Sequence, residues 1–236
     1  MASDLAAQNR AHFNQVASTY DSDFEDALRS LANAVQARRD WIGVDWDGPV
    51  KVLDYACGTG VISRALEPYA TKLIGLDVSE EMVAKYNAHA RALGSNPEKM
   101  SALIGNLTDK ENPPLEQFSD SKFFDFDLIV VGMALHHMED PTYAISRLGE
   151  RLKKGGVLLV IDKLLPLDIY DAEEFIGDAM KTSRHRGFAK GQVTTMFKEA
   201  GIDRRFDIVV LKEPIYIRRG ALEMKWTLFF AKGERV

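Results

Sequence analysis

Two glycines, Gly58 and Gly60, follow directly after an apolar run that ends in an acid, in the stretch VLDYACGTG at 52–60. An apolar run that leads into closely spaced glycines is typical of a buried strand turning into a helix. Glycine lets the backbone turn sharply and approach a ligand, and the first N–H groups of the helix are free to bind it. The stretch therefore predicts a ligand site of the nucleotide-binding kind.

The acid at the strand end, Asp54, narrows the choice of ligand. Its carboxylate would repel a pyrophosphate but attract the ammonium and sulfonium groups of S-adenosylmethionine. The dinucleotide fingerprint also fits poorly, because Ser63 occupies the position of its third glycine. We therefore expect S-adenosylmethionine at this turn, with an NAD-dependent oxidoreductase as the alternative.

A second acid, Asp77, ends the next strand-like segment, KLIGLD at 72–77. An acid at this place can accept both ribose hydroxyls of an adenosine ligand, so it predicts adenosine binding without choosing between cofactors. In an open α/β sheet the ligand lies over the carboxyl ends of the strands. The residues expected to meet at that edge are Asp54, Asp77, Asn106, Gly132 and Asp162.

Adjacent histidines, His136 and His137, follow the fourth strand-like segment. A neutral imidazole can take the proton of an attacking hydroxyl near neutral pH, so His137 is a candidate general base, with Asp162 as its orienting carboxylate. The alternative is that one ring packs in the core while the other is solvated. His185 is a weaker candidate. Transfer of an activated methyl group can also proceed by positioning alone, without a base.

Strand-like and helical segments alternate through the middle of the chain, which predicts a parallel sheet with right-handed crossovers. The strand-like segments are 50–55, 72–77, 101–105, 127–132 and 156–162, and the helical ones are 61–66, 80–93 and 141–152. Residues 110–122 predict a polar loop or a broken helix. Apolar positions recur at helical spacing over 4–41, which predicts a helical cap ahead of the sheet.

The pattern changes after Asp162. Helices are predicted at 168–181 and 191–200. Two strands follow, at 206–212 and 225–232, with a polar turn region between them. Strands joined this closely are expected to be antiparallel neighbours.

Taken together, these motifs resemble the class I S-adenosylmethionine-dependent methyltransferases, in particular the small-molecule branch of ubiquinone/menaquinone methylases. The family's acid-x-Gly-x-Gly-x-Gly motif is similar to the run from Asp54 to Gly60, where Ala56 replaces the first glycine. The fragment FNQVASTYD at 13–21 is similar to the family's entrance motif. The resemblance implies an α/β, Rossmann-like fold. It would have a mostly parallel seven-stranded sheet, an antiparallel C-terminal hairpin and an N-terminal helical cap.

The resemblance also implies contacts to S-adenosylmethionine. Tyr20 would lie near its methionine end, Met82 would pack on the adenine, and Asn106, where the family usually has Asp, would accept from the adenine amine. Tyr20 and Met82 can alternatively be ordinary packing residues. The candidate cofactor-binding residues are Tyr20, Asp54, Ala56, Gly58, Gly60, Asp77, Val78, Met82, Asn106, Leu107 and Gly132.

The chain is long and apolar enough for one sizeable core, with 236 residues of which 46% are hydrophobic. We expect a single methyltransferase domain over 1–236. Its parts are a helical cap at 1–45, a cofactor-binding core at 46–162, a helical segment at 163–204 and a C-terminal hairpin at 205–236.

A net charge of −5 with scattered basic residues argues against a nucleic-acid partner. The sequence has no apolar run of membrane-spanning length and no signal-like start, so we expect a cytoplasmic protein without membrane insertion. The single cysteine, Cys57, excludes intramolecular disulfides and is expected to be a small buried residue. No metal site is expected, and the oligomeric state is left open.

The function expected from these observations is transfer of a methyl group to an O, N, S or C atom of a small-molecule acceptor. The alternatives are a non-catalytic S-adenosylmethionine-binding regulatory module and a protein methyltransferase. Acceptor determinants are expected in the first 45 residues and at 163–190. The acceptor itself is left open.

Overall fold

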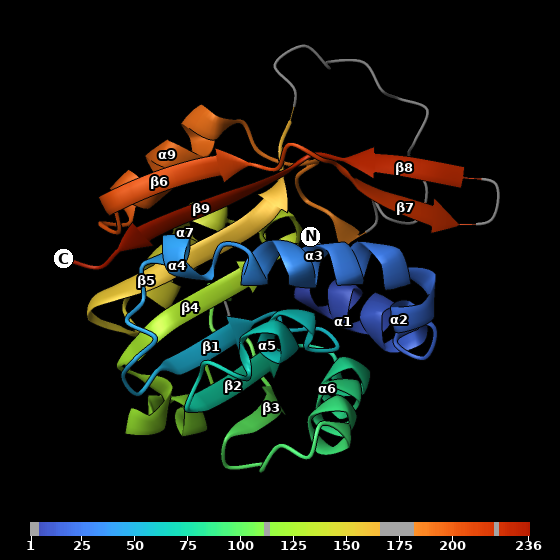
Figure 1. The fold of residues 1–236 in the computed structure, drawn as a ribbon, viewed down its shortest axis with the longest axis horizontal. Coiled ribbons are helices and arrows are strands. Elements are labelled where there is room, and N and C mark those ends of the chain that lie inside the picture. Colours follow the sequence, from blue (N-terminus) through green and yellow to red (C-terminus); the bar gives the residue numbers. More distant parts are fainter. Residues whose placement is uncertain (1–4, 111–113, 166–181, 220–221) are drawn as a thin grey trace.

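A seven-stranded sheet runs through the centre of the protein (Figure 1). The computed structural model describes residues 5–110, 114–165, 182–219 and 222–236. The strand order is β3-β2-β1-β4-β5-β9-β6, with β1 to β5 parallel and β9 antiparallel to both of its neighbours. The strands are β1 Lys51–Tyr55, β2 Lys72–Asp77, β3 Met100–Ile104, β4 Phe126–Gly132, β5 Leu152–Lys163, β6 Arg204–Val210 and β9 Leu228–Glu234. The mostly parallel seven-stranded sheet is confirmed, and its last strand, β9, lies between β5 and β6.

Helices cover both faces of this sheet and enclose two apolar clusters. The helices that follow the strands are α5 Val61–Leu66, α6 Glu80–Ala92, α7 Pro141–Gly149 and α9 Lys190–Glu199. Because successive side chains of a strand point to opposite faces, Val52 joins the cluster under α5 and α6, whereas Leu53 joins the one under α7 and α9. Both faces are therefore buried, as a parallel sheet requires.

The predicted helical cap is present as a series of helices that begins at the carboxyl ends of the strands with α1 and α2 and continues along one face of the sheet with α3 and α4 (Figure 1). Its members are α1 Leu5–Val16, α2 Tyr20–Asp23, α3 Glu25–Gln36 and α4 Arg39–Ile42. Leu31 and Val35 of α3 are buried in the cluster on the α5 side of the sheet. In α1 the buried residue is the polar Asn9. This exception shows that α1 covers something other than the apolar core.

The C-terminal region corrects one prediction. The interval predicted as a polar turn contains a hairpin formed by β7 Ile215–Arg219 and β8 Leu222–Trp226. Ile215 and Ile217 alternate with an exposed Tyr216, and β7 packs beside α3. The predicted antiparallel pairing of the two flanking strands, β6 and β9, is confirmed.

Two further predictions concern the connecting segments. The predicted helix at 168–181 lies outside the described residues. In the predicted broken helix at 110–122, the described part forms short 3-10 turns, η1 Glu116–Ser119 and η2 Ser121–Phe123. Phe118 and Phe123 anchor these turns in the core, with ring centroids 4.9 Å apart.

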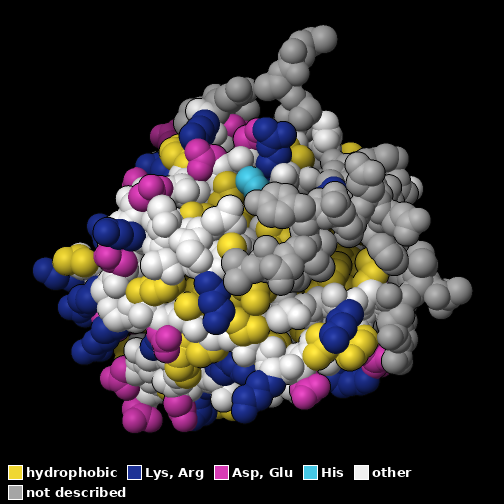
Figure 2. Space-filling view, turned by 90° about the horizontal axis from the view of Figure 1, so that it is seen from above, with side chains coloured by type: hydrophobic (Ala, Val, Ile, Leu, Met, Phe, Trp, Pro, Cys, Tyr) yellow, Lys and Arg dark blue, Asp and Glu magenta, His cyan; other side chains and the backbone are white. Residues whose placement is uncertain are grey.

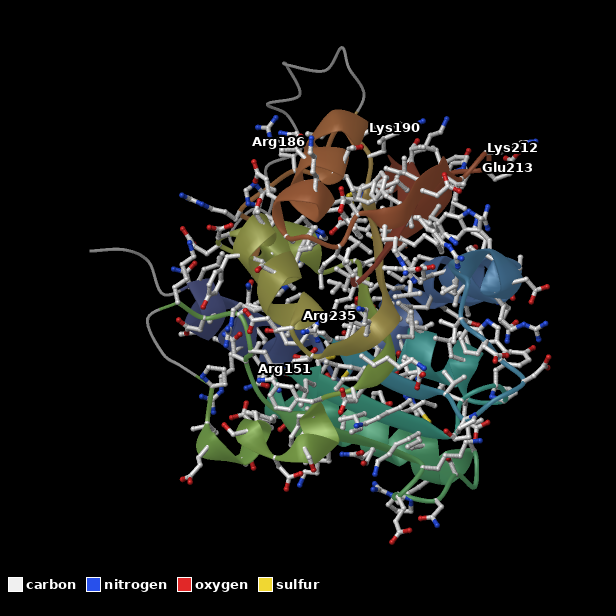
Figure 3. All side chains as sticks on the ribbon, turned by 90° about the vertical axis from the view of Figure 1, so that its left-hand side faces the viewer. Arg151, Arg186, Lys190, Lys212, Glu213 and Arg235 are labelled. Carbon is white, nitrogen blue, oxygen red and sulfur yellow. The ribbon has the colours of Figure 1, made fainter. Side chains whose placement is uncertain are left out.

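Two arginines, Arg151 and Arg235, hold chain segments together near the amino end of β5 (Figure 3). Arg151 Nη1 donates to the carbonyl oxygens of Phe118 and Phe123 at 2.9 and 3.1 Å. Arg235 Nη1 donates to the carbonyl oxygen of Glu150 at 3.0 Å. These basic residues therefore satisfy backbone carbonyl groups between connecting segments.

Candidate active site

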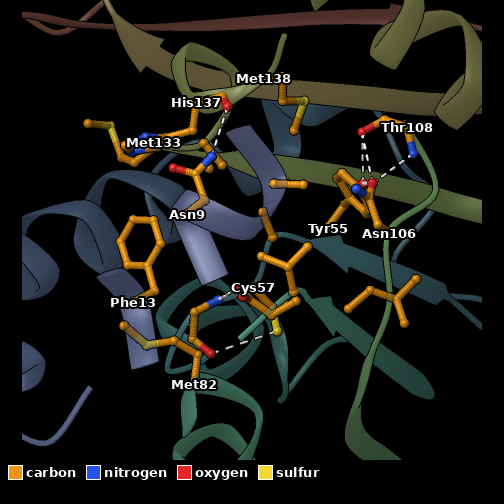
Figure 4. A pocket seen from close by; sticks show the side chains of 18 of the residues that line it. Asn9, Phe13, Tyr55, Cys57, Met82, Asn106, Thr108, Met133, His137 and Met138 are labelled. Carbon is orange, nitrogen blue, oxygen red and sulfur yellow. Dashed lines mark hydrogen bonds between the residues drawn. The ribbon is translucent and has the colours of Figure 1, made fainter. Parts of the chain in front are cut away.

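A cavity of about 400 Å³ lies where the carboxyl ends of β1, β2 and β4 meet the inner side of α1 (Figure 4). Ligand cavities in proteins span roughly 300–1,000 Å³, so this one is large enough for a nucleoside-sized molecule. The predicted site residues in its wall are Tyr20, Ala56, Gly58, Asp77, Val78, Met82, Asn106, Gly132 and His137. Those outside its wall are Asp54, Gly60, Leu107 and Asp162.

The glycine turn after β1 presents backbone to this cavity. Gly58 has φ of 52°, and a Cβ at this position would have no atom within 4 Å, so the space beside it belongs to the cavity. Gly60 has φ of 87°, and a Cβ there would meet the Tyr86 ring at 2.6 Å. Gly58 is thus needed for close approach of a ligand, and Gly60 for packing. Ala56 also adopts a positive φ, 56°, while its methyl group lines the cavity.

Asp77 joins the end of β2 to the glycine turn. Its Oδ2 accepts a hydrogen bond from Gly58 N at 2.9 Å, and its Oδ1 accepts one from Ser79 N at 2.9 Å. Burial raises the pKa of Asp77 above its usual value, although these backbone bonds oppose the shift. The carboxylate lines the cavity and retains acceptor capacity on both oxygens. Its position suits the predicted contact with ribose hydroxyls.

Asp54 takes a different place from the expected one. The side chain is only 2% exposed, and its Oδ2 accepts from Ser63 N at 3.1 Å and from Ser63 Oγ at 2.7 Å. Burial raises the pKa of Asp54 to about 7. The carboxylate therefore supports the start of α5 from beneath and does not face the cavity as the sequence suggested. Ser63, noted only for replacing a glycine, is its partner.

At the opposite side of the turn, Asn106 belongs to a polar cluster with Tyr55 and Thr108. Asn106 Oδ1 accepts from Tyr55 Oη at 2.9 Å and from Thr108 N at 3.0 Å, so protein donors already use the oxygen predicted for the adenine amine. Leu107 N donates to Tyr55 Oη at 3.1 Å, which keeps the Leu107 side chain in the core. Sequence reasoning missed Tyr55, although it ends the first strand and lines the cavity.

The Tyr-Asp pair of the entrance fragment connects the cap to the glycine turn. Tyr20 lines the cavity and packs against Phe24, with ring centroids 4.8 Å apart. Asp21 Oδ1 accepts a hydrogen bond from Thr59 Oγ1 at 2.6 Å. The acid of this fragment therefore has a positioning role, because it fastens α2 to the turn that contains Gly58.

Asp162 pairs with His136 and not with His137, its expected partner. Asp162 lies 2.7 Å from His136 Nδ1 and accepts from His136 N at 3.0 Å, so it orients His136 and not His137. Burial raises the pKa of Asp162, but the charge and hydrogen bond of His136 outweigh this and bring it below the usual value. The predicted dyad of His137 and Asp162 is therefore wrong as a direct contact.

His137 instead contacts a backbone carbonyl, with its Nδ1 2.8 Å from the oxygen of Thr182. A carbonyl oxygen can only accept, so the proton lies on Nδ1 and Nε2 carries a lone pair. Burial, followed by the neighbouring His136, lowers the pKa of His137 to about 3. Because the histidines lie in a 3-10 turn, η3 Leu135–His137, their rings are neighbours with centroids 4.0 Å apart.

Helix α1 covers the cavity and contributes residues that sequence reasoning did not identify. Asn9 Nδ2 donates to the carbonyl oxygen of His137 at 3.1 Å, and the rings of Phe13 and His137 pack nearly perpendicular to each other with centroids 5.3 Å apart (Figure 4). On the outer side of α1, Glu80 accepts hydrogen bonds from Arg10 and Asn14. The helix is thus tethered both to the end of β4 and to the start of α6.

The described part of the chain has neither a reactive thiol nor a cluster of metal-ligating side chains. Cys57 is buried, and burial raises the pKa of its thiol well above the usual value, which keeps it protonated. Within the described residues, no three His, Cys, Asp or Glu side chains gather into a group that could hold a metal ion. None of the helices described is both long and apolar enough to span a membrane.

Known proteins are similar to this chain in sequence and in fold. The family described as "Methyltransferase domain" matches residues 53–158. An uncharacterized methyltransferase of Schizosaccharomyces pombe is 31% identical over 195 residues, which are 79% of this chain and 67% of that protein. A ubiquinone biosynthesis O-methyltransferase of Erwinia tasmaniensis is 27% identical over 62% of this chain and only 56% of its own length.

Among solved structures, magnesium protoporphyrin IX methyltransferase of Synechocystis with bound S-adenosylmethionine has a similar fold. Its TM-score is 0.63 at 16% identity, and the match covers 100% of this chain and 99% of that one. The family match includes β1, β2 and β4, whose carboxyl ends form the cavity. The chain belongs to the class I S-adenosylmethionine-dependent methyltransferases.

Proposed function

We propose that the protein transfers the methyl group of S-adenosylmethionine to an O, N, S or C atom of a small molecule bound under α1. The observation that carries the proposal is the covered cavity of about 400 Å³, which extends from Asp77 to His137. The Asp77 end has the acid and the exposed backbone of Gly58 that an adenosine ligand needs. The His137 end is lined by apolar side chains of Phe13 and Met133, which suit the body of an acceptor.

The residues fit the cofactor part by part. Asp77 would accept the ribose hydroxyls, the open space beside Gly58 would admit the methionine portion, and Met82 would pack on the adenine. When bound, the cofactor supplies a methyl group already activated by a sulfonium. The work left to the protein is to place an acceptor in line with that methyl group and to exclude water. Helix α1, which lies over the cavity, would help to exclude water.

His137 contributes little as a base in this proposal. Its pKa of about 3 leaves the ring neutral at physiological pH but makes it a weak proton acceptor. Positioning is therefore the main source of rate, and the lone pair on His137 Nε2 helps to orient the acceptor. The alternative is that His137 acts as the general base predicted from the sequence, and a pH profile of turnover would test it.

Three observations support a small acceptor over a macromolecule. Leu5, Asn9 and Phe13 of α1 form part of the cavity wall and restrict its size, which favours a small molecule. On the face in Figure 2, the described Lys and Arg side chains are interspersed with Asp and Glu, and such a surface suits a nucleic-acid backbone poorly. The Erwinia relative, named for ubiquinone biosynthesis, further supports a small acceptor.

The test is a screen of small-molecule acceptors with labelled S-adenosylmethionine, measuring the formation of S-adenosylhomocysteine. We expect turnover with at least one compound that has an apolar body. Tight cofactor binding without turnover across a broad panel would favour the regulatory-module alternative. Turnover with intact proteins but no small molecule would favour a protein methyltransferase.

A further inference from the structure

One polar atom in the cavity wall has no partner in the protein. Asn9 is only 8% exposed, and its Nδ2 is used by the carbonyl oxygen of His137 at 3.1 Å. Its Oδ1 is buried and makes no hydrogen bond. Leaving a buried acceptor unsatisfied costs about 1–3 kcal/mol. Since Asn9 lines the cavity, a donor on a bound molecule is the natural partner of this oxygen.

The surroundings of Asn9 define what such a molecule can be. The side chains of Phe13, Met133 and Met138 line the same part of the cavity (Figure 4). The His137 ring adds a second acceptor, because its proton is held on Nδ1 by the carbonyl oxygen of Thr182. This end of the cavity therefore offers acceptor atoms within apolar walls, and it suits an apolar molecule that carries a hydrogen-bond donor.

The charges around the cavity favour a neutral donor. Among the described acids of the cavity wall, Asp140 pairs with Lys110 and Glu139 pairs with Arg184, while Asp77 is assigned to the ribose hydroxyls in the proposed function. Asp109 also has an interaction. An ammonium group would thus find no spare carboxylate among these residues, and a carboxylate ligand would face acceptor atoms. A hydroxyl group meets neither difficulty.

We propose that Asn9 is an acceptor-binding residue, whose Oδ1 receives the hydrogen bond of a neutral hydroxyl on an apolar methyl acceptor. This inference rests on the proposed function, because it places the acceptor beside the cofactor's reactive end. Asn9 selects for a hydroxyl through an otherwise unsatisfied oxygen, and its Nδ2 bond to the His137 carbonyl holds that oxygen in place.

The experiment uses the full chain saturated with S-adenosylhomocysteine and titrates two probes, phenol and anisole, by calorimetry or ligand-observed NMR. Phenol can donate a hydrogen bond, whereas anisole has a similar shape and can only accept. We expect the ratio of phenol affinity to anisole affinity to fall by about 3- to 10-fold in Asn9→Leu, the value of one hydrogen bond. The affinity for S-adenosylhomocysteine should be unchanged.

Two variants separate hydrogen-bond acceptance from helix tethering. Asn9→Gln keeps both an amide donor and an acceptor oxygen, so it should retain a higher ratio of phenol to anisole affinity than Asn9→Leu. Asn14→Leu makes the same amide-to-leucine change elsewhere on α1, where Asn14 contacts Glu80 and Ser79 outside the cavity wall. This variant should leave the ratio of phenol affinity to anisole affinity unchanged.

The outcomes are distinct. An unchanged ratio in Asn9→Leu, an equal loss in Asn9→Gln, or no phenol binding to the loaded wild type would overturn the role of Asn9. Failure of the wild type to bind S-adenosylhomocysteine would instead overturn the proposed function.

Discussion

Burial sets the protonation of the groups around the cavity. The pKa of Asp54 is raised to about 7 and that of His137 is lowered to about 3, in each case chiefly because desolvation disfavours the charged form. The two shifts have opposite consequences for stability. A carboxyl whose pKa is raised loses its stabilising contribution as pH increases, whereas a histidine whose pKa is lowered loses it as pH decreases.

The histidine shift gives a prediction about acid stability. His137 has an unfolded pKa near 6.5 and a folded pKa of about 3, so the unfolded chain binds the proton more strongly between these values. We expect stability to fall with pH from about 6.5 downward, by at most about 1.4 kcal/mol per pH unit from this residue. Denaturant unfolding of the wild type and His137→Gln measures this directly. Parallel pH profiles for the two proteins would show that His137 is not the group responsible.

The sequence predicted which residues lie at the cavity better than it predicted their hydrogen-bond partners. The strand-to-turn pattern placed Gly58 and Asp77 correctly at the cavity, because parallel strands end at one edge and this rule needs no three-dimensional detail. It could not foresee that Asp162 pairs with His136, since a 3-10 turn rotates both rings away from the directions of an extended strand. Asn9 was missed because helical periodicity does not distinguish a buried amide from an exposed one.

At the scale of elements, α1 is the most informative part of the fold. It lies over the cavity and is tethered through polar contacts, since its buried residue is Asn9 and its outer contacts run to Glu80. A helix held in this way opens at low cost compared with one that is anchored in the apolar core. We infer that α1 is the element that moves when ligands enter.

The sequence did not predict the hairpin of β7 and β8, because its short strands surround a polar turn.

The tether of α1 can be weakened without touching the cavity. Glu80→Ala removes the acceptor of Arg10 and Asn14, so we expect hydrogen exchange in residues 5–16 to become about three- to tenfold faster. The control is Glu25→Ala, which removes an exposed acid paired with Arg29 at the start of α3. Equal exchange rates for 5–16 in both variants would contradict the tether.

At the scale of the whole molecule, β9 lies between β5 and β6 and is a tightly packed interior strand of the sheet. Gly233 in β9 lies against the loop after α9, where a Cβ would meet the Ile202 carbonyl oxygen at 1.9 Å and the Phe197 ring at 2.8 Å. Backbone and a fully buried ring cannot both move aside, so this glycine is required by packing. The sequence indicated the antiparallel strand, but its close contact with a loop depends on the tertiary structure.

A pair of glycine substitutions tests this packing. Gly233→Ala should lower the free energy of unfolding by about 2–3 kcal/mol or prevent folding, because overpacking at a backbone contact is costly. Gly191→Ala is the matched control in α9, where a Cβ would have no atom within 4 Å. We expect it to be neutral or stabilising by up to about 1 kcal/mol. Chemical denaturation measures both, and equal effects would refute the packing argument.

The central claim is that the cavity between Asp77 and α1 binds S-adenosylmethionine. Calorimetric titration of S-adenosylhomocysteine into the wild type and Asp77→Ala tests it most directly, with circular dichroism to verify that the variant is folded. We predict one site per chain, no competition by NAD, and an affinity loss of about 1.5–3 kcal/mol in the variant, the range for charge-assisted hydrogen bonds. Displacement by NAD, or unchanged affinity in a folded Asp77→Ala, would contradict this assignment of the site.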